Sequence, residues 1–277
     1  MSDGRKVGLF LSVTFLWSWG FWAIPVLAHR GVALPPALQG LAAEGGNPAA
    51  WGPLVGAIVT ALAAGGFGGL WRLARRGLAF SFGWRWWLVI LLTFPVLVGG
   101  SALLGLALGD PPPGLDGFQA PAQLPFAFVY ILALGGPLQE EFGWRGTLLD
   151  PLQGRFGALF ASLVVGAIWG AWHLPMFYQP TEAIIYERPF WGLLVSCILI
   201  SVLFTWIYNN TGGSVAAVIL FHTMFNFTHY ALAMLLMDNA GLILFIAQTA
   251  LLAWVVWRFG PGRLSRAPAG QDPTRLP

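Results

Sequence analysis

The chain has 277 residues, of which only 9% are charged and 57% are hydrophobic, and its mean hydropathy is +0.71. An ordinary soluble domain carries about a quarter charged residues, so this composition excludes a typical water-soluble fold. Uncharged runs of about 18 or more residues are long enough to cross the hydrocarbon core of a bilayer as helices. The sequence therefore predicts an all-α, polytopic membrane protein, built as a bundle of helices packed on helices.

Taken in chain order, eight charge-poor segments are predicted to span the membrane: 7–28, 49–70, 86–108, 124–150, 156–174, 190–208, 214–234 and 240–257. The first resembles a signal peptide, but its uncharged run exceeds the usual apolar region of about 7–15 residues, which favours a retained helix. One membrane domain is predicted over residues 7–259, after a short N-terminal segment, 1–6. The tail, 260–277, is rich in Pro, Gly, Arg and Ala and is predicted to be disordered.

The distribution of basic residues predicts the orientation of the chain in the membrane. Only Arg30 and Arg188 fall on one side of the predicted spans, and the other 12 of the 14 Lys and Arg residues fall on the opposite side. Because basic residues accumulate on the cytoplasmic side, both termini are expected to be cytoplasmic. No basic run is typical of a nucleic-acid patch, so membrane lipid is the expected partner. The single cysteine, Cys197, is expected to be a small buried apolar residue.

Few ionisable side chains remain inside the predicted spans, and each one is costly there. A charge at mid-membrane costs about 2.5–3.5 kcal/mol on insertion scales, so residues kept at that position are candidates for function. The candidates are Glu140, Glu141, Arg145, His173, His222 and His229.

Glu141 and Arg145 are spaced four residues apart with the acid first, which is the favourable order for an ion pair on a helix. Glu140 points about 100° away from Glu141 and is left as the candidate general base. The alternative is a salt-bridge network of all three residues that braces the cytoplasmic end of the helix. We favour this structural interpretation for Glu141 and Arg145, but not for Glu140.

His222 and Asn226 share one helix face, where an imidazole and a carboxamide can donate hydrogen bonds to an oxyanion or share a metal. The structural alternative is that these two side chains form hydrogen bonds between helices. His229 continues the same face and is interpreted as structural or interfacial. His173 follows Trp169 by four residues, which predicts an aromatic wall beside an imidazole, although helix packing is the alternative role for Trp169.

Three spaced motifs resemble those of a known family. Glu140-Glu141-Phe-Gly-Trp-Arg145 fits its EExxxR motif, Trp169-xxx-His173 resembles its FxxxH motif, and His222-xxx-Asn226 fits its HxxxN motif. The family is the CPBP group, which contains the type II CAAX prenyl endopeptidases and their bacteriocin-processing or bacteriocin-immunity relatives, often called Abi. Trp169 departs from the usual Phe of that motif.

The resemblance implies an intramembrane endopeptidase whose motif core covers residues 124–234 and whose catalytic cavity opens to the cytoplasm. Its location would be the cytoplasmic membrane of a bacterium or archaeon, and its substrate a peptide or a membrane-associated protein. The resemblance implies that Glu140 and His173 activate a water, while His222 and Asn226 stabilise the tetrahedral oxyanion. The supporting residues are Glu141, Arg145 and Trp169.

Members of the family are described either as metal-dependent or as glutamate proteases. The chain lacks an HExxH motif and Asn is a poor zinc ligand, which favours a mechanism without metal or other cofactor. The alternative is a zinc set of Glu140, His173 and His222. Two other classes of function stay open: a transporter or proton pathway that uses the same side chains, which usually has repeated halves that are not seen here, and a non-catalytic immunity or scaffold protein.

Overall fold

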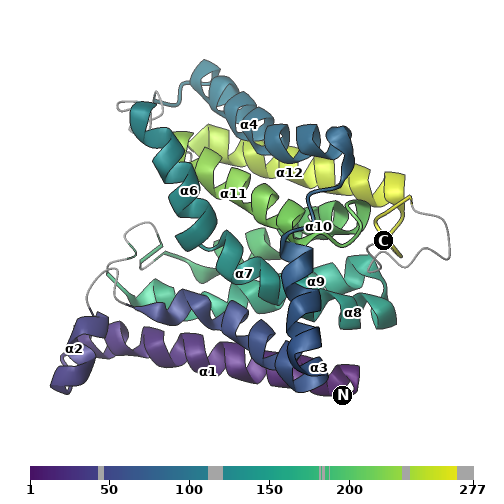
Figure 1. The fold of residues 1–277 in the computed structure, drawn as a ribbon. Coiled ribbons are helices and arrows are strands. Elements are labelled where there is room, and N and C mark those ends of the chain that lie inside the picture. The colour runs from purple at the N-terminus through teal and green to yellow at the C-terminus, as the bar shows by residue number, and fades with distance from the viewer. Residues whose placement is uncertain are drawn as a thin grey trace. The chain divides into compact units, whose positions relative to one another are not determined.

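The computed structural model describes residues 1–42, 47–111, 121–180, 182, 185–186, 188–232 and 238–266. These residues form helices, turns and connecting segments, with no strand among them (Figure 1). They group into two compact units. The first unit comprises Met1–Ala74 and Gln139–Ser201, and the second comprises Arg75–Leu138 and Val202–Pro277.

Within the described part of the chain, seven helical segments are long and apolar enough to cross a membrane. They match seven of the eight predicted spans and confirm an integral membrane protein of the polytopic helical class. The segments are Asp3–His29, Pro48–Gly77, Gly83–Ala107, Ala158–Tyr178, Phe190–Asn210, Val215–Leu232 and Asp238–Phe259. The orientation of the two termini stays a prediction.

The predicted span 124–150 is wrong as a single helix, because the structure breaks it at Gly135 and Gly136. Gly136 has a φ of +111°, and the following Pro137 has no N–H to donate, so the helix ends before this pair and a new one begins after it. The elements that replace the predicted helix are α6 (Leu124–Leu134), α7 (Pro137–Gly143), the π-helical turn η3 (Trp144–Leu148) and α8 (Leu149–Phe156).

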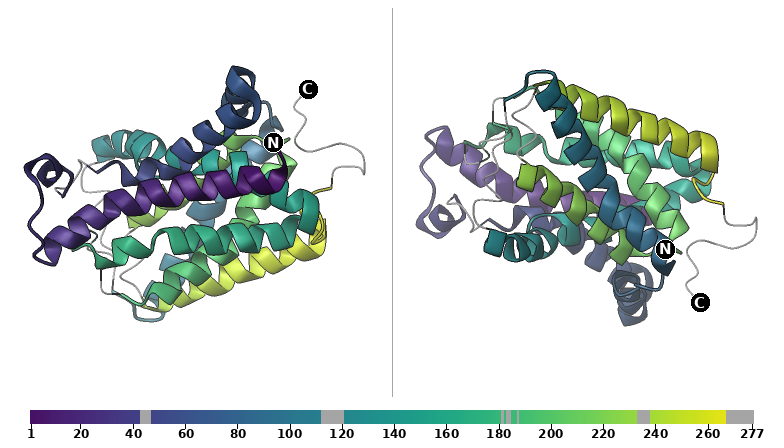
Figure 2. Two further views of the ribbon diagram at one scale, coloured as in Figure 1. Left: turned by 90° about the horizontal axis from the view of Figure 1, so that it is seen from below. Right: turned by 90° about the horizontal axis from the view of Figure 1, so that it is seen from above.

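A ladder of aromatic rings forms the core of the first unit. Phe10 of α1 (Asp3–His29) meets Trp144 edge-on, with ring centroids 5.6 Å apart. Trp144 in turn meets Trp172, the last residue of α9 (Ala158–Trp172), at 5.9 Å, and Trp172 packs on Trp22 of α1 at 4.6 Å. Aromatic pairs in these geometries stabilise beyond the area they bury. The ladder therefore joins α1, η3 and α9. The long helix α1 is the purple ribbon in the view from below (Figure 2).

Close approach of two helix backbones fixes α9 against α10 (Phe190–Asn210) in the same unit. A Cβ added at Gly166 of α9 would lie only 2.6 Å from the carbonyl oxygen of Cys197. Small residues allow this kind of contact between membrane helices. Cys197 itself is buried, as expected for a small apolar residue. The α9 helix ends at Trp172, ahead of Pro175, and continues as the 3-10 turn η4 (Leu174–Tyr178).

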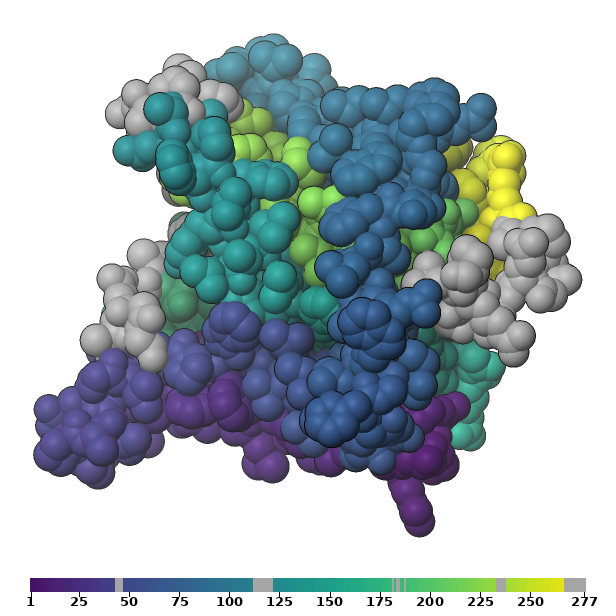
Figure 3. Space-filling view, in the orientation of Figure 1, coloured from purple at the N-terminus to yellow at the C-terminus, as the bar shows by residue number. Residues whose placement is uncertain are grey.

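The helix α3 (Gly52–Gly77) is divided within the length predicted as one span. Gly66 has φ +56° and ψ −150°, a conformation open only to glycine, so two helical halves meet there. The half after the break carries exposed aromatic side chains, with Phe67 86% and Trp71 61% exposed. This dark blue stretch lies at the surface of the face in view in Figure 3.

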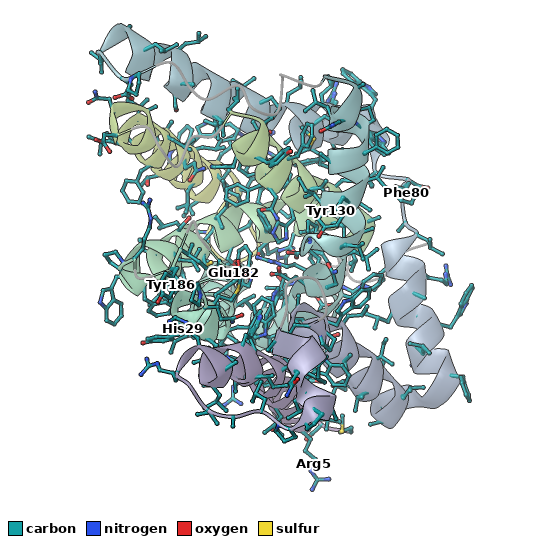
Figure 4. The ribbon with its side chains drawn as sticks, turned by 90° about the vertical axis from the view of Figure 1, so that its left-hand side faces the viewer. Arg5, His29, Phe80, Tyr130, Glu182 and Tyr186 are labelled. Carbon is teal, nitrogen blue, oxygen red and sulfur yellow. The ribbon has the colours of Figure 1, made fainter. Side chains whose placement is uncertain are left out.

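The C-terminal end of α1 contacts a segment that is distant in sequence. His29 Nε2 and the Tyr186 hydroxyl lie 3.1 Å apart, within hydrogen-bond distance, and their rings meet edge-on. Figure 4 shows the two labelled side chains next to each other. Before α3, the short helix α2 (Pro36–Ala42) and the 3-10 turn η1 (Pro48–Trp51) complete the described elements of the first unit's N-terminal half.

The second unit is built on α4 (Gly83–Ala107), which packs against α11 (Val215–Leu232) and α12 (Asp238–Phe259). Figures 1 and 2 both show α12 beside these helices. Phe94 of α4 lies 4.7 Å from Phe221 of α11, ring centroid to ring centroid. A second apolar cluster of the same unit joins α4 to α12 and consists of Val98, Ala102, Ala240 and Leu244.

The start of the C-terminal segment, predicted to be disordered, is held in place in the second unit. Asn210 at the end of α10 donates a hydrogen bond to the carbonyl oxygen of Leu264 at 2.8 Å, and the Leu264 side chain is fully buried. Asn209 likewise donates to the carbonyl oxygen of Arg263 at 2.7 Å, so two side-chain hydrogen bonds and one buried apolar side chain hold this segment. Residues 267–277 lie outside the described part of the chain.

Asp110 links the end of α4 to the beginning of α12. Its Oδ1 accepts hydrogen bonds from the backbone and side-chain N–H groups of Asn239, at 3.1 and 2.8 Å, and its Oδ2 accepts one from the Ala240 backbone at 2.8 Å. Burial favours the neutral acid, but these hydrogen bonds outweigh it and hold the pKa of Asp110 below its usual value. Its negative charge also faces the positive end of the α12 dipole.

We expect Asp110→Asn to lower the thermal unfolding midpoint of the detergent-solubilised protein by about 2–4 °C near neutral pH. The substitution turns the Oδ2 acceptor into a donor and removes the charge. Because the folded-state pKa is lowered, the contribution of Asp110 is complete above the unfolded value of about 3.9 and is lost as the pH falls through the folded value. The difference between variant and wild type should therefore shrink below about pH 4.

Circular dichroism at a series of pH values measures both midpoints. Asp238→Asn is the matched control, because Asp238 lies in the first turn of the same helix with an exposed side chain. An equal loss of stability in the control, or a difference for Asp110→Asn that does not change with pH, would contradict the capping role.

Candidate functional site

A buried ion pair lies in the first unit, as the spacing of Glu141 and Arg145 predicts. The Nη1 of Arg145 donates to both carboxylate oxygens of Glu141 at 2.9 Å, and both side chains are 0% exposed. The Nη2 of Arg145 donates to the Ser201 hydroxyl of α10 at 3.0 Å. Two charges removed from water need good geometry and further hydrogen bonds, and this arrangement provides both.

Glu140 is held separately from this ion pair, although it is the neighbour of Glu141 in the chain. Its side chain is 6% exposed, and its Oε2 accepts hydrogen bonds from two indole N–H groups. Trp144, four residues ahead on the same helix face, donates one of them at 3.3 Å, and Trp169 of α9 donates the other. The ion pair predicted from spacing is therefore present between Glu141 and Arg145, while Glu140, expected to be unpaired, is bound by two indole groups.

Trp169 contacts the Glu140 carboxylate and the Arg145 guanidinium at the same time. Its indole N–H bonds Glu140, and its ring lies under the guanidinium of Arg145, with Cζ 5.3 Å from the ring centroid. A cation over an aromatic face is attracted to it, most strongly where water is excluded. The sequence predicts only a wall beside His173, whose ring centroid lies 6.0 Å from that of Trp169.

His173 caps the C-terminal end of α9. Its Nδ1 lies 2.8 Å from the backbone carbonyl oxygen of Trp169. A carbonyl oxygen only accepts hydrogen bonds, so Nδ1 carries a proton, and in the neutral form of the ring Nε2 is the basic nitrogen. The structure thus gives His173 the tautomer that a proton acceptor at Nε2 requires.

His222 and Asn226 lie in the second unit, on α11. His222 is 2% exposed and packs against Phe204, with ring centroids 5.2 Å apart. The side-chain amide of Asn226 donates to the carbonyl oxygen of Gly135 at 3.3 Å, at the break that precedes α7. His229 Nδ1 lies 2.8 Å from the Phe225 carbonyl oxygen, as expected for a structural histidine.

The two units therefore each contain part of the predicted site. The first unit brings five of the predicted residues together: Glu140, Glu141, Arg145, Trp169 and His173. The second unit holds His222 and Asn226. A common site of both groups stays a prediction.

Two residues that contact the predicted site residues, Trp144 and Ser201, are not among the candidates identified from the sequence. Trp144 could have been found, because it follows Glu140 by four residues and so shares its helix face. Ser201 could not, because a single serine within an apolar helix has no distinguishing pattern. Its contact with Arg145 depends on how α10 packs in the folded unit.

The zinc alternative of Glu140, His173 and His222 stays a prediction. Glu140 Oε2 receives two N–H groups, which leaves Oε1 as the oxygen that could bind a metal ion. In the described ranges, no three His, Cys, Asp or Glu side chains are grouped so that they could hold a metal ion.

Comparison with known proteins agrees with the motifs. Residues 122–228 match the family described as type II CAAX prenyl endopeptidase Rce1-like. A relative named CAAX prenyl protease 2, from the archaeon Methanococcus maripaludis, is 27% identical over 154 residues. That match covers 52% of this chain, and it spans only 56% of the relative's own length.

All four predicted catalytic residues, Glu140, His173, His222 and Asn226, lie inside the matched segment. The fit of the EExxxR and HxxxN motifs, the approximate FxxxH motif and the membrane helices agree with the same assignment. Over residues 122–228, this chain is therefore similar to the Rce1-like type II CAAX prenyl endopeptidases.

Proposed function

We propose that this protein is an intramembrane endopeptidase that hydrolyses a peptide bond in a membrane-associated polypeptide. The observation that carries the proposal is the environment of Glu140, a buried carboxylate that is separated from the Glu141–Arg145 ion pair and oriented by two indole donors. A structural acid in this position would be expected to pair with the nearest cation. The match of residues 122–228 to an endopeptidase family supports the same function.

Glu140 is the general base of the proposed reaction. Its Oε2 already accepts two hydrogen bonds, so Oε1 is the oxygen that takes a proton from the attacking water. Proton transfer by a positioned carboxylate contributes about 10²–10⁴-fold to a rate. The same proton then goes to the nitrogen of the leaving amine, and the peptide bond breaks.

His173 assists Glu140 in holding the water. Because Nδ1 donates to the Trp169 carbonyl, Nε2 of the neutral ring accepts a hydrogen bond from the water. This hydrogen bond orients the water so that a lone pair of its oxygen points at the substrate carbonyl carbon. His222 and Asn226 donate hydrogen bonds to the oxyanion that forms on that carbonyl. Each such donor contributes about 10²–10³-fold when it is aimed in advance.

We favour a glutamate-type reaction, without metal, in the cytoplasmic membrane of a prokaryote and with the site open to the cytoplasm. The lack of an HExxH motif in the chain supports it. The archaeal relative is named for a CAAX substrate, so a prenylated C-terminal tail is one candidate substrate here, beside leader peptides and other membrane-associated proteins. The family matches favour this function over a transporter or a non-catalytic scaffold.

Glu140→Gln should lower the rate of peptide cleavage by about 10²–10⁴-fold, because the amide cannot accept the proton from water. The measurement is cleavage of a prenylated CAAX peptide by the purified protein in detergent or in proteoliposomes. Asp238→Asn is the control, since it makes the equivalent carboxylate-to-amide change at an exposed residue in the first turn of α12. Turnover by Glu140→Gln at the wild-type rate would contradict the proposed base.

Removal of metal ions should leave the activity unchanged. We expect protein dialysed against a strong chelator, with metal content checked by mass spectrometry, to cleave the same peptide at the untreated rate. Loss of cleavage on dialysis, together with its recovery on addition of zinc, would instead assign Glu140, His173 and His222 as ligands.

A further inference from the structure

The carboxylate of Glu140 accepts a hydrogen bond from the indole N–H of Trp169, which a phenyl ring at this position could not donate. Trp169 donates its indole N–H to Glu140 Oε2 from a different helix, α9, whereas Trp144 donates from the turn that follows α7. Both donors are buried, with Trp144 0% and Trp169 3% exposed. Hydrogen bonds to an ionised acceptor are stronger than neutral ones, and more so where water is excluded.

We propose that Trp169 is a positioning residue that sets the orientation of the Glu140 carboxylate through its indole N–H. The inference rests on the proposed function in that Glu140 is the base. It assigns to Trp169 a polar role distinct from that of an aromatic wall beside His173.

The indole is itself held in place, which is what makes it able to position another side chain. Arg145 lies over its ring, and Arg145 is fixed by Glu141 on one side and by Ser201 of α10 on the other. A glutamate has three rotatable bonds, so its carboxylate moves unless a rigid donor restrains it. A misplacement of about 1 Å is enough to cost a large part of a catalytic rate.

Two substitutions separate the N–H group of Trp169 from its ring. Trp169→Phe keeps a six-membered aromatic ring under Arg145 and removes the donor. Trp169→His keeps a ring nitrogen, because the imidazole overlays the five-membered part of the indole and brings Nε2 to the place of Nε1. The matched control is Trp172→Phe, since Trp172 is 1% exposed and its Nε1 has no hydrogen-bond partner in the described part of the chain.

We expect Trp169→Phe to lower kcat for peptide cleavage by about tenfold, the loss of one hydrogen bond to a charged group, with KM changed by less than about twofold. Trp169→His should retain most of the wild-type kcat above the pH at which imidazole is neutral. Trp172→Phe should lower the thermal unfolding midpoint about as much as Trp169→Phe, without the same fall in kcat. Equal kcat for Trp169→Phe and wild type would overturn the proposal.

A spectroscopic measurement tests the hydrogen bond without relying on protease activity. The chain has only 11 Asp and Glu residues, so the infrared carboxylate stretch of Glu140 can be assigned by subtracting the spectrum of Glu140→Gln. We expect this band to shift in Trp169→Phe and to stay near its wild-type position in Trp169→His and Trp172→Phe. An unshifted band in Trp169→Phe would overturn the proposal even if the protein cleaves peptides. A shifted band with no cleavage by the wild type would support the contact and reject the proposed function.

Discussion

The guanidinium of Arg145 is the charged group around which the described site is organised. It has no contact with water, and a cation in such a place is tolerated only when its donors are satisfied and a negative charge lies beside it. Three helices and a π-helical turn supply its partners: Glu141 from α7, Ser201 from α10 and the ring of Trp169 from α9, with Arg145 itself on η3. Loss of one partner of such a buried pair commonly costs about 3–5 kcal/mol, so this contact fixes the relative register of four elements.

The apolar packing of the first unit supports that register from the other side. The ladder of Phe10, Trp144, Trp172 and Trp22 joins α1 to the same turn and to the same helix that carry Arg145 and Trp169. Gly166 brings the α9 backbone against α10, which carries Ser201. The polar contacts and the packing therefore constrain the same helices, as is expected of a rigid site.

Much of the architecture can be predicted from the sequence, because a charge-poor run of sufficient length has few alternatives to a membrane helix. The two breaks within predicted spans could not be predicted in this way. Gly135 and Gly136 lie inside a run that stays apolar across the break, and so do Gly65 and Gly66. Within the site, contacts four residues apart follow from helix geometry, which is why the pairing of Glu141 with Arg145 is predictable. The bond from Trp169 to Glu140 joins residues 29 positions apart, and no local pattern contains that information.

The hydrogen bond from Asn226 to the Gly135 carbonyl bears on how kinetic data for this residue can be interpreted. In the proposed reaction Asn226 stabilises the oxyanion, and in the structure it also anchors a chain break, so it would contribute to both the ground state and the barrier. A rate deficit after its truncation is then a sum of two free energies, and a double-mutant cycle is needed to separate them. The amide at this position has two N–H groups, and in this structure one of them is already committed to the backbone.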